Sequence, residues 1–77
     1  MEYYYIIWAG DGYNATDKQY FSAELAIRDA VRYSFDNKEK VWIEFIERDE
    51  SQIYSVKYKT IFRLDYNKIM KLDKKII

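Results

Sequence analysis

The sequence predicts a small α+β domain in which an antiparallel sheet carries one helix on one face. Three observations predict it: an aromatic and β-branched run at 3–9, an apolar repeat of three and four residues over 23–34, and two strand-like runs at 41–48 and 53–60. The expected order is β-α-β-β, followed by a C-terminal strand or short helix. A chain of 77 residues is enough for one domain, so we treat residues 1–77 as a single domain.

The first strand is predicted at residues 3–9, which end at Gly10. The run is apolar in both parities, so we expect a central strand or one with both faces covered. Residues 10–14 have turn chemistry and open a loop that reaches Tyr20. Asp11, Asn14 and Asp17 offer oxygen ligands there, but the spacing is not that of an EF-hand. We therefore expect an Asx turn that leads into a helix rather than a calcium site.

The helix is predicted to begin after Ser22 and to end near Asp36 and Asn37. Ser22 is a favourable N-cap residue, and Glu24 suits the positive end of the helix dipole. The apolar positions recur on one helical face, which predicts the side that packs on the sheet. They are Ala23, Ala26, Ile27, Ala30, Val31 and Ser34.

Residues 41–48 and 53–60 are predicted to form a hairpin whose turn is Asp49-Glu50-Ser51-Gln52. Pairing Arg48 with Ile53 defines a register with two distinct faces. The apolar face, toward the helix, would pair Val41, Ile43 and Phe45 with Thr60, Tyr58 and Val56. The other face would pair Trp42, Glu44 and Ile46 with Lys59, Lys57 and Ser55, which makes Glu44–Lys57 a directly opposed charge pair.

The C-terminal segment from Tyr66 to Ile77 fits two structures. Its apolar positions match a helical stripe, while residues 69–72 alone match a last strand. A loosely packed tail over residues 66–77 is the remaining possibility. This segment decides whether the sheet face away from the helix is covered.

The composition argues against an enzyme and against a bound cofactor or metal. The chain has no Cys and no His, so it lacks thiolate ligands, the commonest transition-metal ligand and the usual general base. Glu44, Glu47, Asp49 and Glu50 gather near the predicted hairpin end, where we expect a solvated acidic edge rather than a catalytic carboxylate pair. No run of 18 apolar residues predicts a membrane span, and no basic-then-apolar start predicts a secretory signal. We therefore expect a cytoplasmic protein.

Aromatic residues exceed what one small core needs: the chain has nine Tyr, four Phe and two Trp. We expect the core to use Phe21, Phe35, Phe45, Tyr58 and Phe62. The surplus would lie on the face away from the helix, joined by one parity of the first strand, either Tyr4, Ile6 and Trp8 or Tyr3, Tyr5 and Ile7. An exposed apolar face of this kind usually marks a binding site. The candidate partner-binding residues are Trp42, Glu44, Ile46, Glu47, Asp49, Glu50, Lys57 and Lys59.

Two functions remain open. The first is a module that binds a larger host protein or complex, with homodimerisation through the same face as a further alternative. Residues 1–56 carry a charge balance of −5 and residues 57–77 one of +5, from six basic and eleven acidic residues against seven basic and two acidic. The acidic hairpin end would then occupy a nucleic-acid-binding surface of the partner.

The chain is rich in Ile, Tyr, Lys, Asn and Asp and lacks Pro, His and Cys, a bias typical of AT-rich genomes. In general character it resembles small phage or mobile-element proteins that block host systems, including anti-CRISPR-type inhibitors. The resemblance lies in size and composition rather than in a motif. It implies an inhibitor that acts in the cytoplasm of a host cell.

The second function is single-stranded nucleic-acid binding. Aromatics with Lys57, Lys59 and Arg63 on one sheet face suit base stacking, and the lysines of the C-terminal segment suit phosphate contacts. These lysines are Lys68, Lys71, Lys74 and Lys75. The net charge of zero gives this function the lesser weight.

Overall fold

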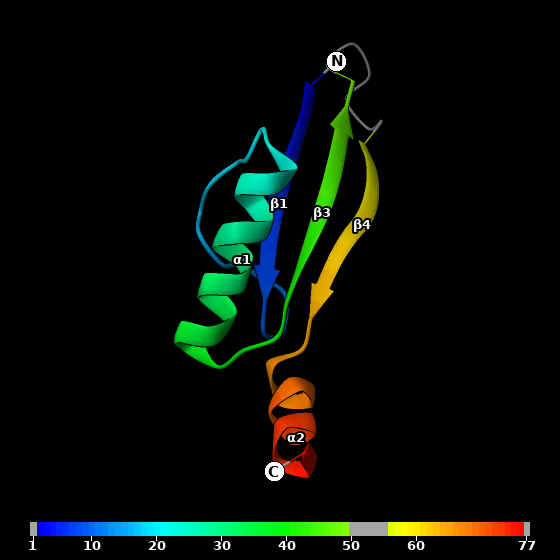
Figure 1. The fold of residues 1–77 in the computed structure, drawn as a ribbon. Coiled ribbons are helices and arrows are strands. Elements are labelled where there is room, and N and C mark those ends of the chain that lie inside the picture. The colour runs from blue at the N-terminus through cyan, green and yellow to red at the C-terminus, as the bar shows by residue number, and fades with distance from the viewer. Residues whose placement is uncertain (1, 50–55, 77) are drawn as a thin grey trace.

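The computed structural model describes residues 2–49 and 56–76, and for residues 73–76 the backbone alone. Its elements are β1 (Glu2–Ala9), β2 (Tyr13–Asn14), α1 (Ala23–Asn37), β3 (Val41–Arg48), β4 (Val56–Leu64) and α2 (Tyr66–Ile76). All neighbouring strands are antiparallel, in the order β2-β1-β3-β4 (Figure 1). The predicted α+β class with one main helix is therefore confirmed, and the short β2 is an addition to the predicted order.

Helix α1 has the predicted ends. The Ser22 side chain accepts a hydrogen bond from the backbone N–H of Leu25 at 3.3 Å, as an N-cap does. The helix closes at Lys38, whose φ of 55° is left-handed and whose N–H bonds to the Ser34 carbonyl. Ala26, Ala30 and Ser34 are the buried positions, and they belong to the predicted apolar stripe.

The core lies between α1 and one face of the sheet. Ile7 of β1 and Ile43 of β3 are fully buried beneath Ala26 and Ala30. The alanines have no bulk beyond Cβ, so the helix backbone approaches the sheet closely. The Tyr20 side chain also belongs to this core. Its backbone exchanges two hydrogen bonds with that of Tyr5, at 2.7 and 2.9 Å, which hold the residue against β1. The loop before α1 is thus attached to the free edge of β1.

The predicted register of β3 and β4 was wrong. Trp42 lies opposite Arg63 rather than Lys59, and Glu44 lies opposite Thr60 rather than Lys57. A bulge shifts the pairing by one residue between Ile43 and Glu44, so one constant register does not fit the described part of the hairpin. Residues 53–55 of the predicted second strand lie outside the described residues. The predicted turn residues 50–52 lie outside the described residues.

In the observed register, residues 57–60 of β4 lie on the opposite faces of the sheet from those predicted. Next to Phe45, the partner is Lys59 instead of Val56, a shift of three residues. An odd shift exchanges the faces of a strand, because successive side chains alternate. Lys57 and Lys59 therefore lie on the α1 side of the sheet, and Tyr58 and Thr60 lie on the opposite side. The directly opposed charge pair is Glu47–Lys57.

The C-terminal segment forms a helix, so the alternative of a last strand is excluded. The Asp65 carboxylate caps α2 by accepting hydrogen bonds from the backbone N–H groups of Asn67 and Lys68, at 3.1 and 3.4 Å. Figure 1 shows α2 continuing beyond the end of the sheet rather than folding across it. Its ring contact with α1 is edge-to-face, with the Phe35 and Tyr66 centroids 5.6 Å apart. The molecule is consequently elongated, 54 × 19 × 17 Å. Neither helix in the described ranges is long and apolar enough to cross a bilayer.

Candidate functional site

The sheet face opposite α1, here called the open face, is the candidate site. The register orders its side chains in three cross-strand rows: Trp8–Trp42–Arg63 nearest α2, Ile6–Glu44–Thr60 in the middle, and Tyr4–Ile46–Tyr58 farthest from α2. Because α2 leaves from the end of the sheet, neither described helix lies over this face (Figure 1).

The open face has an aliphatic floor and an aromatic margin. Ile6 and Ile46 are 7% and 5% exposed, whereas Tyr58 is 65% exposed. Trp8 and Trp42 are half-buried side by side. The indole N–H of Trp8 is buried without an acceptor among the described residues, so this ring contributes apolar area rather than a hydrogen bond. Much of the aromatic surface here remains available for contact.

Two hollows follow one another along the open face. The upper hollow, toward the start of β1 in Figure 1, has a volume of about 360 Å³; the lower hollow, toward α2, has one of about 450 Å³. The upper hollow is lined by Tyr4, Ile6, Trp8, Asn14, Gln19, Ile46, Arg48, Val56 and Tyr58. The lower hollow is lined by Lys40, Val41, Trp42, Glu44, Thr60, Arg63, Leu64, Asp65 and Lys68.

Cations outnumber anions around the lower hollow. Lys40 precedes β3, Arg63 lies on β4 and Lys68 lies in the first turn of α2, so three separate segments supply the positive charges. Among the described residues none of the three forms an ion pair. Of the two carboxylates, Asp65 is engaged in capping α2. The lower hollow thus combines an aromatic wall at Trp42 with unpaired positive charge.

Three of the predicted partner-binding residues lie where the sequence placed them. Trp42, Glu44 and Ile46 all belong to the open face, on the side of β3 away from α1. Of the two parities weighed for the first strand, Tyr4, Ile6 and Trp8 join them. Their role in binding stays a prediction.

The other predicted residues do not join that face. Lys57 and Lys59 lie on the α1 side of the sheet, because the register differs from the predicted one, and Glu47 lies there because it shares the parity of Ile43 in β3. Asp49 follows the end of β3, and Glu50 lies outside the described residues. Glu44 and Glu47 are three residues apart in β3, so their side chains lie on opposite faces of the sheet. The described acidic residues do not form one acidic surface.

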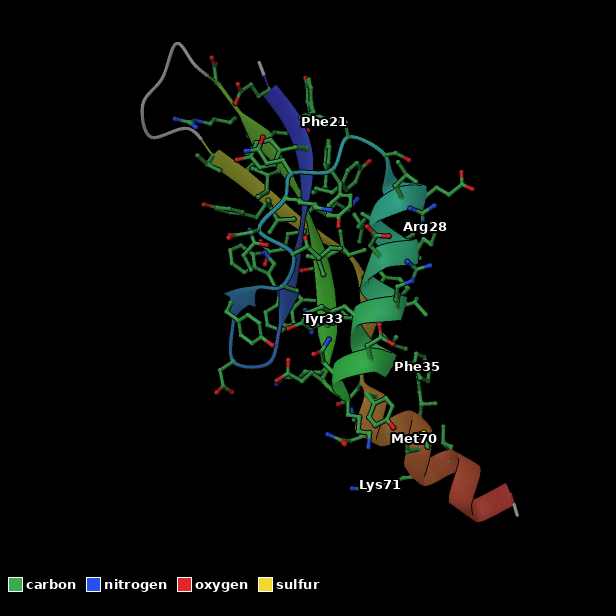
Figure 2. The ribbon with its side chains drawn as sticks, turned by 90° about the vertical axis from the view of Figure 1, so that its left-hand side faces the viewer. Phe21, Arg28, Tyr33, Phe35, Met70 and Lys71 are labelled. Carbon is green, nitrogen blue, oxygen red and sulfur yellow. The ribbon has the colours of Figure 1, made fainter. Side chains whose placement is uncertain are left out.

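The predicted aromatic core was wrong at three of its five positions. Phe21, Phe35 and Tyr58 are 77%, 46% and 65% exposed. Figure 2 places Phe21 beside the start of α1 and Phe35 near the junction with α2. Phe45 and Phe62 are partly buried as expected. Tyr20, the residue before Phe21, belongs to the core instead.

Sequence reasoning also missed Lys40, Thr60 and Tyr58 as members of the candidate site. Lys40 lies two residues before Trp42, so the sequence alone could have indicated that the two residues are close together. Thr60 and Tyr58 depend on the bulge opposite Ile43 and Glu44, for which no Gly or Pro in β4 gives a signal. Arg63 was assigned to this face only for nucleic-acid binding.

The groups with shifted pKa values lie away from the open face, and each is hydrogen-bonded to another side chain. The hydrogen bond that Tyr13 donates to Glu39, followed by its contact with the Tyr33 hydroxyl, raises the pKa of Tyr13. The Tyr20 hydroxyl donates to Asp29 at 2.9 Å, and this bond holds the pKa of the Asp29 carboxyl below its usual range. These pairs stabilise the loop around α1, so they have a structural explanation.

The loop between β2 and α1 shows the expected Asx turn. The Asn14 side-chain oxygen accepts hydrogen bonds from the backbone N–H groups of Thr16 and Asp17, at 3.4 and 3.0 Å. Across the described residues, no three His, Cys, Asp or Glu side chains are grouped as metal ligands.

Comparisons with protein-family models, curated proteins and solved structures found no match to this chain.

Proposed function

We propose that this protein is a non-enzymatic module that binds a larger protein through the open face. The observation that carries the proposal is an aliphatic floor of Ile6 and Ile46 flanked by Trp8, Trp42 and Tyr58, on a sheet face that α2 leaves uncovered. Apolar side chains that stay exposed together on a small domain usually mark an interaction surface.

The residue types support a protein partner. Trp and Tyr are enriched among interface residues that dominate binding energy, because they give large contact area with few torsions to restrict. The upper and lower hollows give the face the relief that interlocking side chains require. Glu44, Thr60 and Arg63 add polar and charged groups among these apolar side chains, and protein interfaces commonly combine both kinds.

Nucleic-acid binding has less support from this geometry than from the sequence. Two of the three cations assigned to the stacking face, Lys57 and Lys59, lie on the α1 side. Glu44 stands in the middle row of the open face, where its carboxylate repels a phosphate backbone. The buried Ile6 and Ile46 between the aromatic side chains are more typical of a protein interface than of a base-stacking platform.

Inhibition by occupancy is the activity we propose for such a module. A small domain that covers a functional surface of a host enzyme or defence complex needs no catalytic group of its own. The phage-like composition of the chain supports this proposal. The described acidic residues are divided between two faces, which favours binding through the open face over mimicry of a nucleic acid.

Substitution of one exposed aromatic residue tests the site. Tyr58→Ala removes the most exposed aromatic ring of the open face, and Phe21→Ala removes a similarly exposed ring elsewhere. Wild-type and variant proteins would be immobilised and used to capture partners from a lysate of cells that naturally carry the gene. We expect Tyr58→Ala to weaken the captured complex by about 30-fold, the effect of an interface hot spot, and Phe21→Ala to leave it unchanged.

The melting temperature of both variants provides the control, since both side chains are exposed and both proteins should remain folded. Equal retention of the partner by wild type and Tyr58→Ala contradicts the proposal. Recovery of nucleic acid instead of protein, with salt-sensitive retention, supports the second function.

A further inference from the structure

We infer that the lower hollow receives an acidic segment of the protein partner, with carboxylates between Lys40, Arg63 and Lys68 and an apolar side chain against Trp42. The inference rests on the proposed function and specifies the chemistry of the partner. It arises from a hollow of about 450 Å³ whose cations have no described counter-ion.

The three cations of the lower hollow come from three different segments of the chain. Lys40 lies in the connection from α1 to β3, Arg63 near the end of β4 and Lys68 in α2, yet all three line one hollow. Cations from separate segments repel one another when they share a small volume. An arriving carboxylate relieves that repulsion and gains charge-assisted hydrogen bonds, which the forked guanidinium of Arg63 can provide in pairs.

The anions already present do not neutralise this set. The Asp65 carboxylate accepts two backbone hydrogen bonds at the start of α2 and is held there. Glu44 lies one row away, opposite Thr60, and forms no ion pair with a described residue. Glu44 therefore borders the site and limits where a second acidic group of the partner can lie.

The position of the lower hollow favours a polypeptide over a free anion. The row Trp8–Trp42–Arg63 belongs at one end to the apolar upper hollow and at the other to the basic lower hollow. A partner segment that places apolar side chains on the sheet therefore reaches the cations without leaving the open face. The volume of the lower hollow, about 450 Å³, is within the range of ligand-binding pockets in proteins.

The two tryptophans allow a direct test. Trp42 lines the lower hollow and Trp8 lines the upper one, so their indole N–H resonances report on the two hollows separately. ¹⁵N-labelled full-length protein would be titrated at low salt with an acetylated hexaglutamate peptide carrying a terminal Phe. We expect saturable shifts of the Trp42 indole and of the Arg63 and Lys68 amides, with smaller shifts of the Trp8 indole.

Charge variants make the test specific. Arg63→Ala should weaken peptide binding by about two- to fivefold, the usual range for one exposed ion pair. Lys59→Ala is the matched control, since it removes a cation from the same strand but from the α1 side, and it should change nothing. Glu44→Gln should strengthen binding by about the same two- to fivefold factor, because it removes a repulsive charge. A merely structural role of Glu44 does not predict tighter binding.

Two further ligands complete the experiment: a short oligothymidine and inorganic phosphate. Tighter binding of the peptide than of either ligand supports the inference. Tighter binding of oligothymidine or phosphate, no saturable shift at Trp42, or equal effects of Arg63→Ala and Lys59→Ala overturns it. If the peptide does not bind while Tyr58→Ala still weakens capture of the partner, the proposed function stands and only the acidic chemistry of the partner is wrong. If Tyr58→Ala retains the partner, the proposed function itself is wrong.

Discussion

The two faces of the sheet are similarly hydrophobic in sequence but differ in the residues that they use. The face under α1 presents Ile7, Ala9 and Ile43, all with no exposed surface. The open face presents two tryptophans and Tyr58, which retain partial or high exposure. Strand residues without exposed surface therefore lie under α1, whereas the open face combines the nearly buried Ile6 and Ile46 with large aromatic side chains that stay partly exposed.

The difference has a geometric cause. A helix that packs on a sheet approaches closely only if the residues between them are small, as Ala26 and Ala30 are. Trp8 and Trp42 are too large for such a layer, so they pack beside each other within the plane of their own face. Helix α1 thus covers one face of the sheet, and α2 projects beyond the sheet instead of covering the other.

The largest expected effect separates the two faces by stability. Ile43→Ala opens a cavity in the covered core and should lower the free energy of unfolding by about 3–4 kcal/mol. Tyr58→Ala, at a position that is 65% exposed on the open face, should cost less than about 1 kcal/mol. Urea unfolding of both variants, followed by tryptophan fluorescence, measures the contrast. Similar losses would show that the open face is as much a part of the core as the covered one.

The sequence was sufficient to predict the elements whose signals are local. The N-cap at Ser22, the apolar stripe of α1 and the alternation of β3 each depend on a few neighbouring residues, and each agrees with the structure. The parity of β3 then placed Trp42 and Ile46 on the open face correctly. These are the residues on which the candidate site was first based.

The sequence was insufficient where pairing depends on distant residues. The pairing of β4 with β3 includes a bulge beside Ile43, and no Gly or Pro in β4 gives a local signal for it. Because the predicted register was wrong by three residues in this part of β4, Lys59 was assigned to the open face and Tyr58 to the core. The direction of α2 was equally undetermined, because an amphipathic pattern predicts a helix but not the surface it adjoins.

A smaller effect is expected at the end of α1, which fixes the covered face against β3. Ser34 is fully buried, and its hydroxyl donates to the Glu39 carbonyl at 2.6 Å. Ser34→Ala removes the donor of this part-buried hydrogen bond and should cost about 1–3 kcal/mol.

Asn37→Ala is the matched control for that substitution. The Asn37 side chain also donates to a backbone carbonyl, that of Tyr33 at 3.0 Å, but at an exposed position. Its loss should cost no more than about 0.5 kcal/mol, because water replaces the donor. Thermal unfolding of both variants tests the difference, and a greater loss for Asn37→Ala would mean that burial does not decide the value of these bonds.

The smallest effect concerns pH and the loop that closes the covered face. The Tyr20 hydroxyl donates to Asp29, and this bond holds the pKa of Asp29 below its unfolded value. Stability from a lowered carboxyl pKa is present above the unfolded pKa and is lost as pH falls through the folded one. Wild type should therefore exceed Tyr20→Phe by less than about 1 kcal/mol at neutral pH, and the difference should shrink below about pH 4. Urea unfolding of both proteins from pH 7 to pH 2 measures it, with Arg28→Gln as the control for the neighbouring ion pair at 3.3 Å. A difference that is constant across this range would assign the loss to packing around Tyr20 rather than to its bond with the Asp29 carboxylate.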